Sequence, residues 1–243
     1  MIGVIGGTGL SSIKDLVISR HEDINTLYGK PSEPLTVGNF GGKDIIFLAR
    51  HGKNHSIPPH LINYQANISA FNLMGVTDII SIASVGSINP KDEPGTLVFP
   101  DQLVDYTYGR KHTFFDGEKE PVSHIDFTYP YDEGLRNNLI EIALSSNFLF
   151  KKEGVYGAVQ GPRLETAAEI NRYEGDGVTI VGMTGMPEAA LAKELNINYA
   201  TICLVANHAA GRGLSEDGIT HEEISKNSEE MMLNVIKIIK EIS

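Results

Sequence analysis

The sequence predicts an α/β fold, and three observations carry that prediction. Apolar, β-branched runs typical of strands alternate with amphipathic stretches typical of helices. Small-residue turns rich in glycine follow several of the apolar runs. No repeat, low-complexity run or linker interrupts the alternation, so we expect a single domain over residues 1–243.

The clearest unit lies at residues 178–211. It consists of an apolar strand, a small-residue turn, an alanine-rich helix and a second apolar strand, at residues 178–182, 183–186, 187–195 and 199–207. Pro187 suits the first helical position, where its missing N–H costs nothing, and Glu188 suits the positive end of the helix dipole. The succession predicts a βαβ unit, and ligands of such sheets gather beyond the strand ends.

The other elements follow from the same periodicities. Strands are predicted at residues 1–5, 43–49, 78–83, 96–99, 102–106 and 154–159, and helices at 63–73, 133–146, from about 166 to 172, and 221–242. Ser84 to Ser87 read as a small-residue turn with exposed N–H groups, and residues 17–42 indicate no chemistry. Residues 109–130 are polar, aromatic and irregular, which in a compact domain usually marks function or an interface.

Composition and charge exclude several classes of protein. A net charge of −11 and a pI near 5.2 argue against binding to nucleic acid or anionic membranes, which need basic surface. No apolar run approaches the roughly 20 residues of a membrane span, and the N-terminus lacks the charged region of a signal peptide. Cys203 stands alone and cannot form an internal disulfide. We therefore expect a cytoplasmic protein.

A glycine-rich turn, Gly6-Gly7-Thr8-Gly9, follows the first strand and offers backbone N–H groups to an anion. A dinucleotide fold needs Gly-x-Gly-x-x-Gly, but the sixth position counted from Gly7 is Ser12. No Gly-Lys-Ser/Thr follows, so the P-loop pattern fails as well. What distinguishes this turn is the hydroxyl of Thr8.

The strand at 43–49 ends in Arg50 and His51, a cation pair suited to phosphate. A surface salt bridge is the alternative interpretation of this pair. His51, His55 and His60 also raise the question of a metal site. Prolines in this stretch prevent a shared helical face, and no Cys or paired carboxylate joins the histidines, so we expect no metal.

Three strand-end elements that lie far apart in the sequence predict one bound anion. They are Thr8 with its glycines, Arg50 with His51, and Thr184, with backbone N–H groups near Ser84 as a further contributor. No nucleophile–base pair, paired carboxylates or metal set stands out elsewhere. A bound phosphate could itself be the nucleophile, with the protein acting by positioning and electrostatics.

Along nearly its whole length, the chain resembles the trimeric purine nucleoside phosphorylase and methylthioadenosine phosphorylase family. The matching segments are Ile5-Gly-Gly-Thr-Gly9, Arg50-His51-Gly52, Asn63-Tyr-Gln-Ala-Asn67, Val85-Gly86-Ser87, Gln160-Gly-Pro-Arg163, Gly182-Met-Thr184 and Pro187-Glu188. The resemblance implies a three-layer α/β/α fold with a central mixed sheet, assembled as a homotrimer. It also implies that inorganic phosphate, as co-substrate and without any cofactor, attacks the anomeric carbon of a purine nucleoside.

The resemblance assigns a role to each candidate residue. Phosphate would be bound by Thr8, Arg50, His51, Thr184 and the Ser84 backbone, with His51 and Asn207 as the catalytic residues. Met183 would meet the ribose through its backbone N–H, and Asn207 would donate to the purine. His124 would reach the 5′ side of a neighbouring subunit's substrate.

The base preference follows from donors and acceptors. A 6-oxopurine presents N1–H and an acceptor at O6, and a 6-aminopurine reverses both. The Glu165 carboxylate can only accept, which suits N1–H, and the Asn207 amide can donate to O6 or N7. Family members that prefer adenine have an aspartate at the Asn207 position and a hydroxyl residue at that of Glu165, and their further aspartate is Ala209 here. We therefore expect hypoxanthine-type substrates.

The 5′ group leaves alternatives open. Asn63 to Asn67 and Ser123-His124-Ile125 resemble the methylthio branch, particularly its methylthioinosine members, which favours S-methyl-5′-thioinosine as substrate. His221 falls where plain nucleoside phosphorylases use a histidine for the 5′-hydroxyl, which keeps inosine or guanosine open. Methylthioadenosine is the remaining substrate within the family. A nicotinamide-dependent oxidoreductase and a catalytically silent nucleoside-binding protein are the hypotheses from other classes.

Overall fold

The computed structural model describes residues 1–7 and 16–242, except for the side chains of His221, Glu223 and Glu230. Its strands form an 11-stranded sheet with the order β2-β3-β4-β1-β5-β10-β9-β7, in which β11 pairs with β5 and β6, and β8 pairs with β6. The bounds are β1 Ile2–Gly6, β2 Val17–Glu22, β3 Leu35–Phe40, β4 Lys43–Ala49, β5 Asp78–Ser87, β6 Leu97–Val98, β7 Gln102–Asp105, β8 Phe150–Lys151, β9 Val155–Ala158, β10 Ile180–Gly182 and β11 Asn198–His208.

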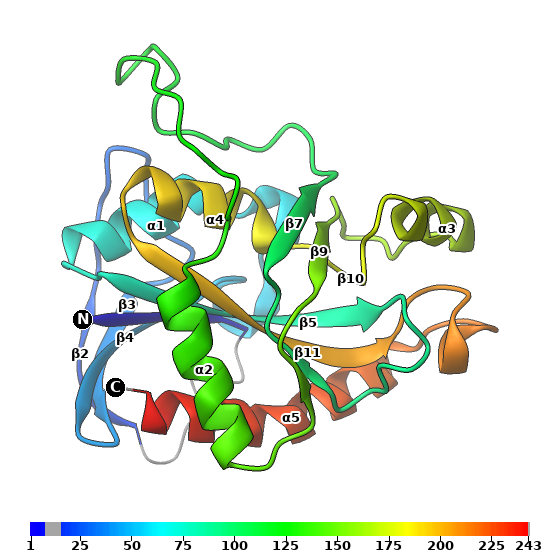
Figure 1. Cartoon of the computed structure of the whole chain (residues 1–243). Helices are drawn as coiled ribbons and strands as arrows, with labels where there is room; N and C mark the ends of the chain where they lie inside the picture. Colours follow the sequence, from blue (N-terminus) through cyan, green and yellow to red (C-terminus); the bar gives the residue numbers. More distant parts are fainter. Residues whose placement is uncertain (8–15, 243) are drawn as a thin grey trace.

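Helices cover both faces of this sheet (Figure 1). Helices α1 (Tyr64–Leu73) and α4 (Gly185–Glu194) pack on one face, and α2 (Glu133–Ser145) and α5 (His221–Glu241) pack on the other. Helix α3 (Ala167–Gly175) packs in a third, smaller apolar cluster. Pairing is parallel for β1 with β5 and antiparallel for β10 with β5. The expected three-layer α/β/α fold with a mixed sheet is therefore confirmed.

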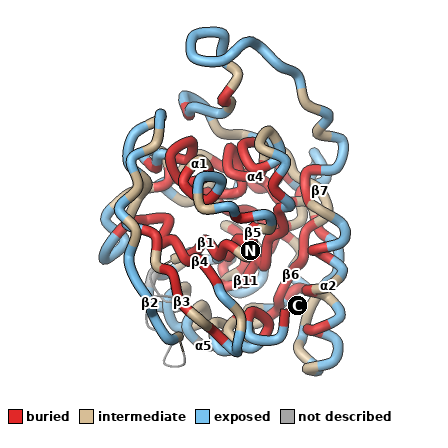
Figure 2. The backbone as a smooth tube through the Cα atoms, turned by 90° about the vertical axis from the view of Figure 1, so that its left-hand side faces the viewer, coloured by how far each residue is buried: buried red, intermediate tan, exposed pale blue. Residues whose placement is uncertain are grey.

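The burial pattern follows these layers. Buried backbone fills the middle of the molecule, where β1, β4, β5 and β11 lie between the helices (Figure 2). The segment 109–130, irregular as expected, projects from the body in both views (Figures 1 and 2). None of the helices that the structure describes combines the length and apolarity that crossing a bilayer requires.

Side-chain caps explain where three helices begin. The Asn63 side chain accepts from the backbone N–H of Ala66 at the start of α1. The Asp132 side chain accepts from the backbone N–H of Leu135 at the start of α2. Thr166 and Glu169 form a reciprocal capping box at the start of α3. These caps satisfy N–H groups that have no partner within the helix, so the predicted helix starts near 63, 133 and 166 are confirmed.

Strand β5 corrects one expectation. Ser84 to Ser87 form no turn, because the strand continues to Ser87, paired with β11 along its length and with β10 at Gly86 and Ser87. Hydrogen bonding to two neighbours outweighs the turn propensity of serine and glycine. Residues 17–42, which gave no functional prediction, contain the edge strand β2 and its neighbour β3.

The prediction that residues 178–211 form a βαβ unit is wrong. Strands β10 and β11 both flank β5, but β10 runs antiparallel to it and β11 parallel, so β10 and β11 oppose each other. A βαβ unit requires parallel strands, so this segment is not one. Helix α4 has an extended residue at Met186, so its regular turns begin at Pro187, as expected.

One packing contact tests the interface between β1 and α1. A Cβ at Gly3 would lie 2.9 Å from the Phe71 ring and from Val76 Cγ1. We expect Gly3→Ala to lower the free energy of unfolding by about 1–3 kcal/mol, because the buried neighbours must move. Urea unfolding measures this. Gly175→Ala is the control: its Cβ meets open space at a helix end, and it should stabilise by up to about 1 kcal/mol. Equal stability of the two variants would contradict the prediction.

Candidate active site

A gap in the pairing of β5 defines the candidate site. On one edge of β5, strand β1 pairs as far as Ser81, opposite Ile5, and β10 arrives from the other direction to pair with Gly86, opposite Val181. Between these two pairings, residues 82–85 of β5 have no strand partner on this edge within the described part of the chain, so their backbone groups are open to other partners. The ends of β1 and β10 therefore face each other across the middle of the sheet.

Arg50 fills one side of this gap. It follows β4, is 1% exposed, and its Nη1 donates to the carbonyl of Ile82 at 3.0 Å. Nη2 donates to the Ile5 carbonyl at 3.3 Å and to Ser81 Oγ at 2.8 Å. The side chain thus connects the end of β1 to the open edge of β5. A surface salt bridge, the alternative considered for this pair, is excluded by the burial.

Glu188 neutralises Arg50 inside the protein. Its carboxylate accepts from Arg50 Nε at 2.7 Å and Nη2 at 2.8 Å, from Ser81 Oγ at 3.0 Å and from Tyr199 Oη at 2.9 Å. The sequence predicted that Glu188 interacts with the helix dipole, and it did not predict this role as a buried counter-ion. One Nη1 hydrogen of Arg50 has no partner among the described residues and is available to an anion.

His51 lies beside Arg50 as a neutral imidazole. Its Nδ1 donates to the Ile57 carbonyl at 2.9 Å, since a carbonyl can only accept, and its ring stacks on His55 with centroids 4.0 Å apart. Burial, with the nearby Arg50 charge, lowers the pKa of His51 to about 4. At neutral pH its Nε2 is therefore an acceptor. Within the described ranges, no three His, Cys, Asp or Glu side chains gather as metal ligands.

Ser84 and Thr184 lie on either side of the gap. Backbone groups two residues apart in a strand point the same way, so the Ser84 N–H faces the edge where the Ile82 carbonyl meets Arg50. The Ser84 hydroxyl lies 2.9 Å from that of Ser228 on α5. Thr184 is buried at the start of α4, just after the end of β10. Both residues are therefore brought to the same part of the sheet as Arg50.

Two of the residues expected to meet the nucleoside, Asn207 and Met183, lie beside β5 and directly after β10, respectively. Asn207 pairs with Gly86 from the β11 side, and its Nδ2 donates one hydrogen to the His208 carbonyl at 2.6 Å. Gly161 packs against the Met183 side chain, where a Cβ would come within 2.5 Å of Sδ. This contact joins the segment that carries Glu165 to the end of β10. Glu165 itself is half-buried, and burial raises its pKa.

The described part of the structure does not place three of the predicted site residues at the gap in β5. Thr8 lies outside the described residues, and so does the side chain of His221. His124 belongs to the irregular segment 109–130 and is exposed. Its expected role concerned a neighbouring subunit's substrate.

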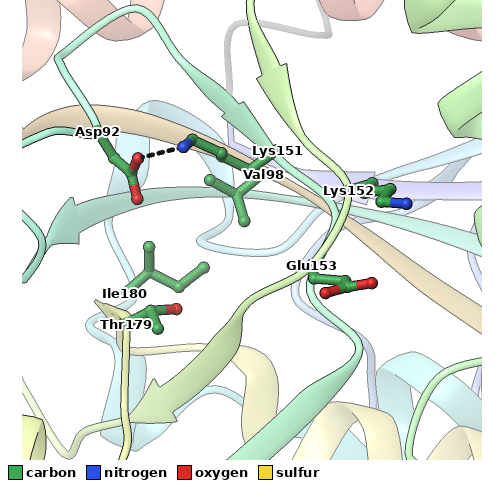
Figure 3. Close-up of a pocket in the computed structure, with 7 residues that line it drawn as sticks. All are labelled: Asp92, Val98, Lys151, Lys152, Glu153, Thr179 and Ile180. Atoms are coloured by element: carbon green, nitrogen blue, oxygen red, sulfur yellow. Dashed lines mark ion pairs between the residues drawn. The ribbon is translucent and has the colours of Figure 1, made fainter.

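A separate hollow of about 300 Å³ lies at the opposite end of β10 (Figure 3). Its lining residues are Asp92, Val98, Lys151, Lys152, Glu153, Thr179 and Ile180. Asp92 and Lys151 form an ion pair of 3.0 Å across it, and none of the predicted site residues lines it. We therefore take the gap in β5, and not this hollow, as the candidate active site.

Comparison with known proteins shows the family of this chain. All 243 residues, 1–243, match the family model described as the phosphorylase superfamily. A probable S-methyl-5′-thioinosine phosphorylase of Pseudomonas syringae pv. tomato is 49% identical over 223 residues, which are 92% of this chain and 90% of that one. The 6-oxopurine nucleoside phosphorylase of Pyrococcus furiosus is 43% identical over 98% of this chain and 90% of its own.

A solved structure extends the comparison to three dimensions. The methylthioadenosine phosphorylase from Schistosoma mansoni in complex with adenine superposes with a TM-score of 0.93 at 28% identity, over 99% of this chain and 90% of that one. The family match over the full length, the identities above and the shared fold lead to one conclusion. The chain is an enzyme that belongs to the phosphorylase superfamily.

Proposed function

We propose that this enzyme cleaves S-methyl-5′-thioinosine with inorganic phosphate. An oxygen of hydrogen phosphate bonds to the anomeric carbon, and the bond from that carbon to N9 breaks with its electron pair going to the purine. The proton that the phosphate loses converts the leaving purine to hypoxanthine. The other product is 5-methylthioribose 1-phosphate. The observation that carries the proposal is the convergence of Arg50, Ser84 and Thr184 on the gap in β5, with Asn207 flanking the same strand at Gly86.

The phosphate site uses donors at the facing strand ends. The remaining Nη1 hydrogen of Arg50, the Ser84 backbone N–H, the Thr184 hydroxyl and Thr8 donate to the anion. His51 contributes as an acceptor, because its Nε2 can accept from the protonated oxygen of hydrogen phosphate. The transition state leaves positive charge on the sugar, which the phosphate stabilises. Catalysis then comes from positioning and fixed electrostatics, without a cofactor or metal.

The base is selected by Glu165 and Asn207. The Glu165 carboxylate accepts from N1–H of a 6-oxopurine, and the Asn207 amide uses its second Nδ2 hydrogen for N7 or O6. A 6-aminopurine would leave these groups mismatched, which discriminates by up to roughly 10⁴-fold. The 6-oxopurine relative from Pyrococcus furiosus supports this choice.

The assembly and location form part of the proposal. Residues 1–243 act as one domain within a cytoplasmic homotrimer. The projecting segment carries His124 to the 5′ side of a neighbouring subunit's substrate, next to Met183, whose backbone N–H binds the ribose. His221 is the candidate for contact with a 5′-hydroxyl, if inosine is also accepted.

A four-substrate assay tests the function. Methylthioinosine, methylthioadenosine, inosine and guanosine are each incubated with the protein, with and without phosphate, and the free base is quantified. We expect the highest kcat/KM for methylthioinosine and no base release without phosphate. A preference for methylthioadenosine would refute the selection by Glu165 and Asn207. Base release that ignores phosphate would refute the proposed function.

The buried ion pair allows the structural and phosphate-binding roles of Arg50 to be separated. Arg50→Met leaves Glu188 buried without its counter-ion and should destabilise by about 3–5 kcal/mol. The double variant Arg50→Met/Glu188→Met should regain most of this stability, because an apolar pair replaces the ion pair. Its KM for phosphate should nevertheless rise by at least about tenfold, the value of a charge-assisted hydrogen bond.

Urea unfolding and initial rates against phosphate concentration measure both effects. A double variant with normal stability and an unchanged KM for phosphate would remove Arg50 from the phosphate site.

The raised pKa of Glu165 predicts a pH-dependent base preference. The ionised carboxylate only accepts, whereas the protonated form can donate to N1 and accept from the 6-amino group of adenine. As pH falls towards the pKa, the ratio of kcat/KM for methylthioadenosine to that for methylthioinosine should rise. The rise is up to about tenfold per pH unit, following the protonated fraction.

Glu165→Gln is the matched control, because the amide both donates and accepts at every pH. Its substrate ratio should be higher than that of the wild type at neutral pH and independent of pH. A wild-type ratio that is flat with pH would contradict the assigned role of Glu165.

A further inference from the structure

Arg110 is the second residue of the irregular segment 109–130, and it is 9% exposed. Nη1 donates to the backbone carbonyls of Met183 at 2.9 Å and Met186 at 2.5 Å. Nη2 donates to those of Val159 at 3.3 Å and Gln160 at 2.9 Å. One side chain therefore ties together the ends of two neighbouring strands, β9 and β10.

These carbonyls belong to the segments that frame the nucleoside. The Gln160 segment leads to Glu165, and the peptide between Met183 and Thr184 is fixed at both ends. Its carbonyl accepts from Arg110, and its N–H donates to the Tyr156 hydroxyl at 3.3 Å. Fixing this peptide restricts the direction of the neighbouring Met183 N–H.

The acceptors around Arg110 are all uncharged. Besides the carbonyls it reaches Tyr64 Oη at 3.1 Å and lies over the Tyr64 ring, 5.4 Å from its centroid. Its Nε is buried without a partner among the described residues, and no carboxylate there pairs with it. A buried cation without a carboxylate is costly, so stability alone does not account for it. Arg136 differs, because it donates to carbonyls and also pairs with Glu133.

We propose that Arg110 is a positioning residue that holds the Gln160 and Met183 segments at the separation which the nucleoside requires. The planar guanidinium reaches carbonyls of both strands at once, which the point charge of a lysine cannot do. The role acts first on the base and ribose contacts, because Arg110 contacts the carbonyls of Met183 and Gln160 directly and reaches Thr184 only through the peptide that Thr184 shares with Met183. It rests on the proposed function.

Arg110→Lys tests the proposal, because it keeps the charge and removes the fork. We expect the KM for methylthioinosine to rise and kcat/KM to fall by roughly 10²-fold, as for a small misplacement of reacting groups. The KM for phosphate should change much less than the KM for methylthioinosine, because Arg110 contacts none of the phosphate donors directly and affects Thr184 only through the Met183–Thr184 peptide. Arg136→Lys, at a buried arginine away from the site, should lose stability with both KM values unchanged.

The two KM values separate the outcomes. A folding defect reduces the amount of active enzyme, and so the maximal rate, without changing either KM. An unchanged nucleoside KM in Arg110→Lys, with the wild type active, would overturn the inference alone. No phosphorolysis by the wild type would overturn the proposed function and the inference together.

If Arg110→Lys is too unstable to assay, Arg110→Ala with added millimolar guanidinium replaces it. Recovery of the nucleoside KM on adding guanidinium, measured against added potassium chloride, would support the positioning role. Equal effects of the two salts would overturn it.

Discussion

The buried ion pair between Arg50 and Glu188 is the interaction on which the site depends. Both side chains are removed from water, so their charges are tolerated only because hydrogen bonds satisfy them. Those bonds come from β1, β5 and β11 as well as from the pair itself. The pair therefore fixes the start of α4 relative to the central strands, and Thr184 stands at that start.

The direction of β10 turns this arrangement into a site within the sheet. In a purely parallel sheet, ligands bind beyond the carboxyl ends of the strands, which all lie on the same side of the sheet. Here β10 runs against β5, so its C-terminal end meets that of β1 partway along β5. Backbone groups of β5 are left facing the space between the two ends. Donors from the end of β4, from β5 and from the start of α4 can then face one space without any long loop.

Local patterns predicted the elements well, and long-range pairing was harder to predict. The apolar run at 43–49 coincides with β4, and the caps at Asn63 and Thr166 fixed two helix starts. The direction of β10 carries no local signal, because a short apolar strand pairs in either sense. Glu188 pairs with Arg50, which lies 138 positions away in the sequence. From its position directly after Pro187, the sequence predicted only an interaction with the helix dipole. Nothing in the sequence indicated that Arg110 would be buried.

The balance of charge in the described part of the site explains how an acidic protein can bind an anion. Glu188 cancels the charge of Arg50, and His51 is neutral, which leaves the unpaired charge of Arg110 behind the Met183 peptide. The net charge of −11 is spread over the surface, where salt screens it beyond about 8 Å. Charges in the interior are screened far less. Oriented donors such as the remaining Nη1 hydrogen of Arg50 and the Ser84 N–H therefore outweigh the acidic exterior at contact distance.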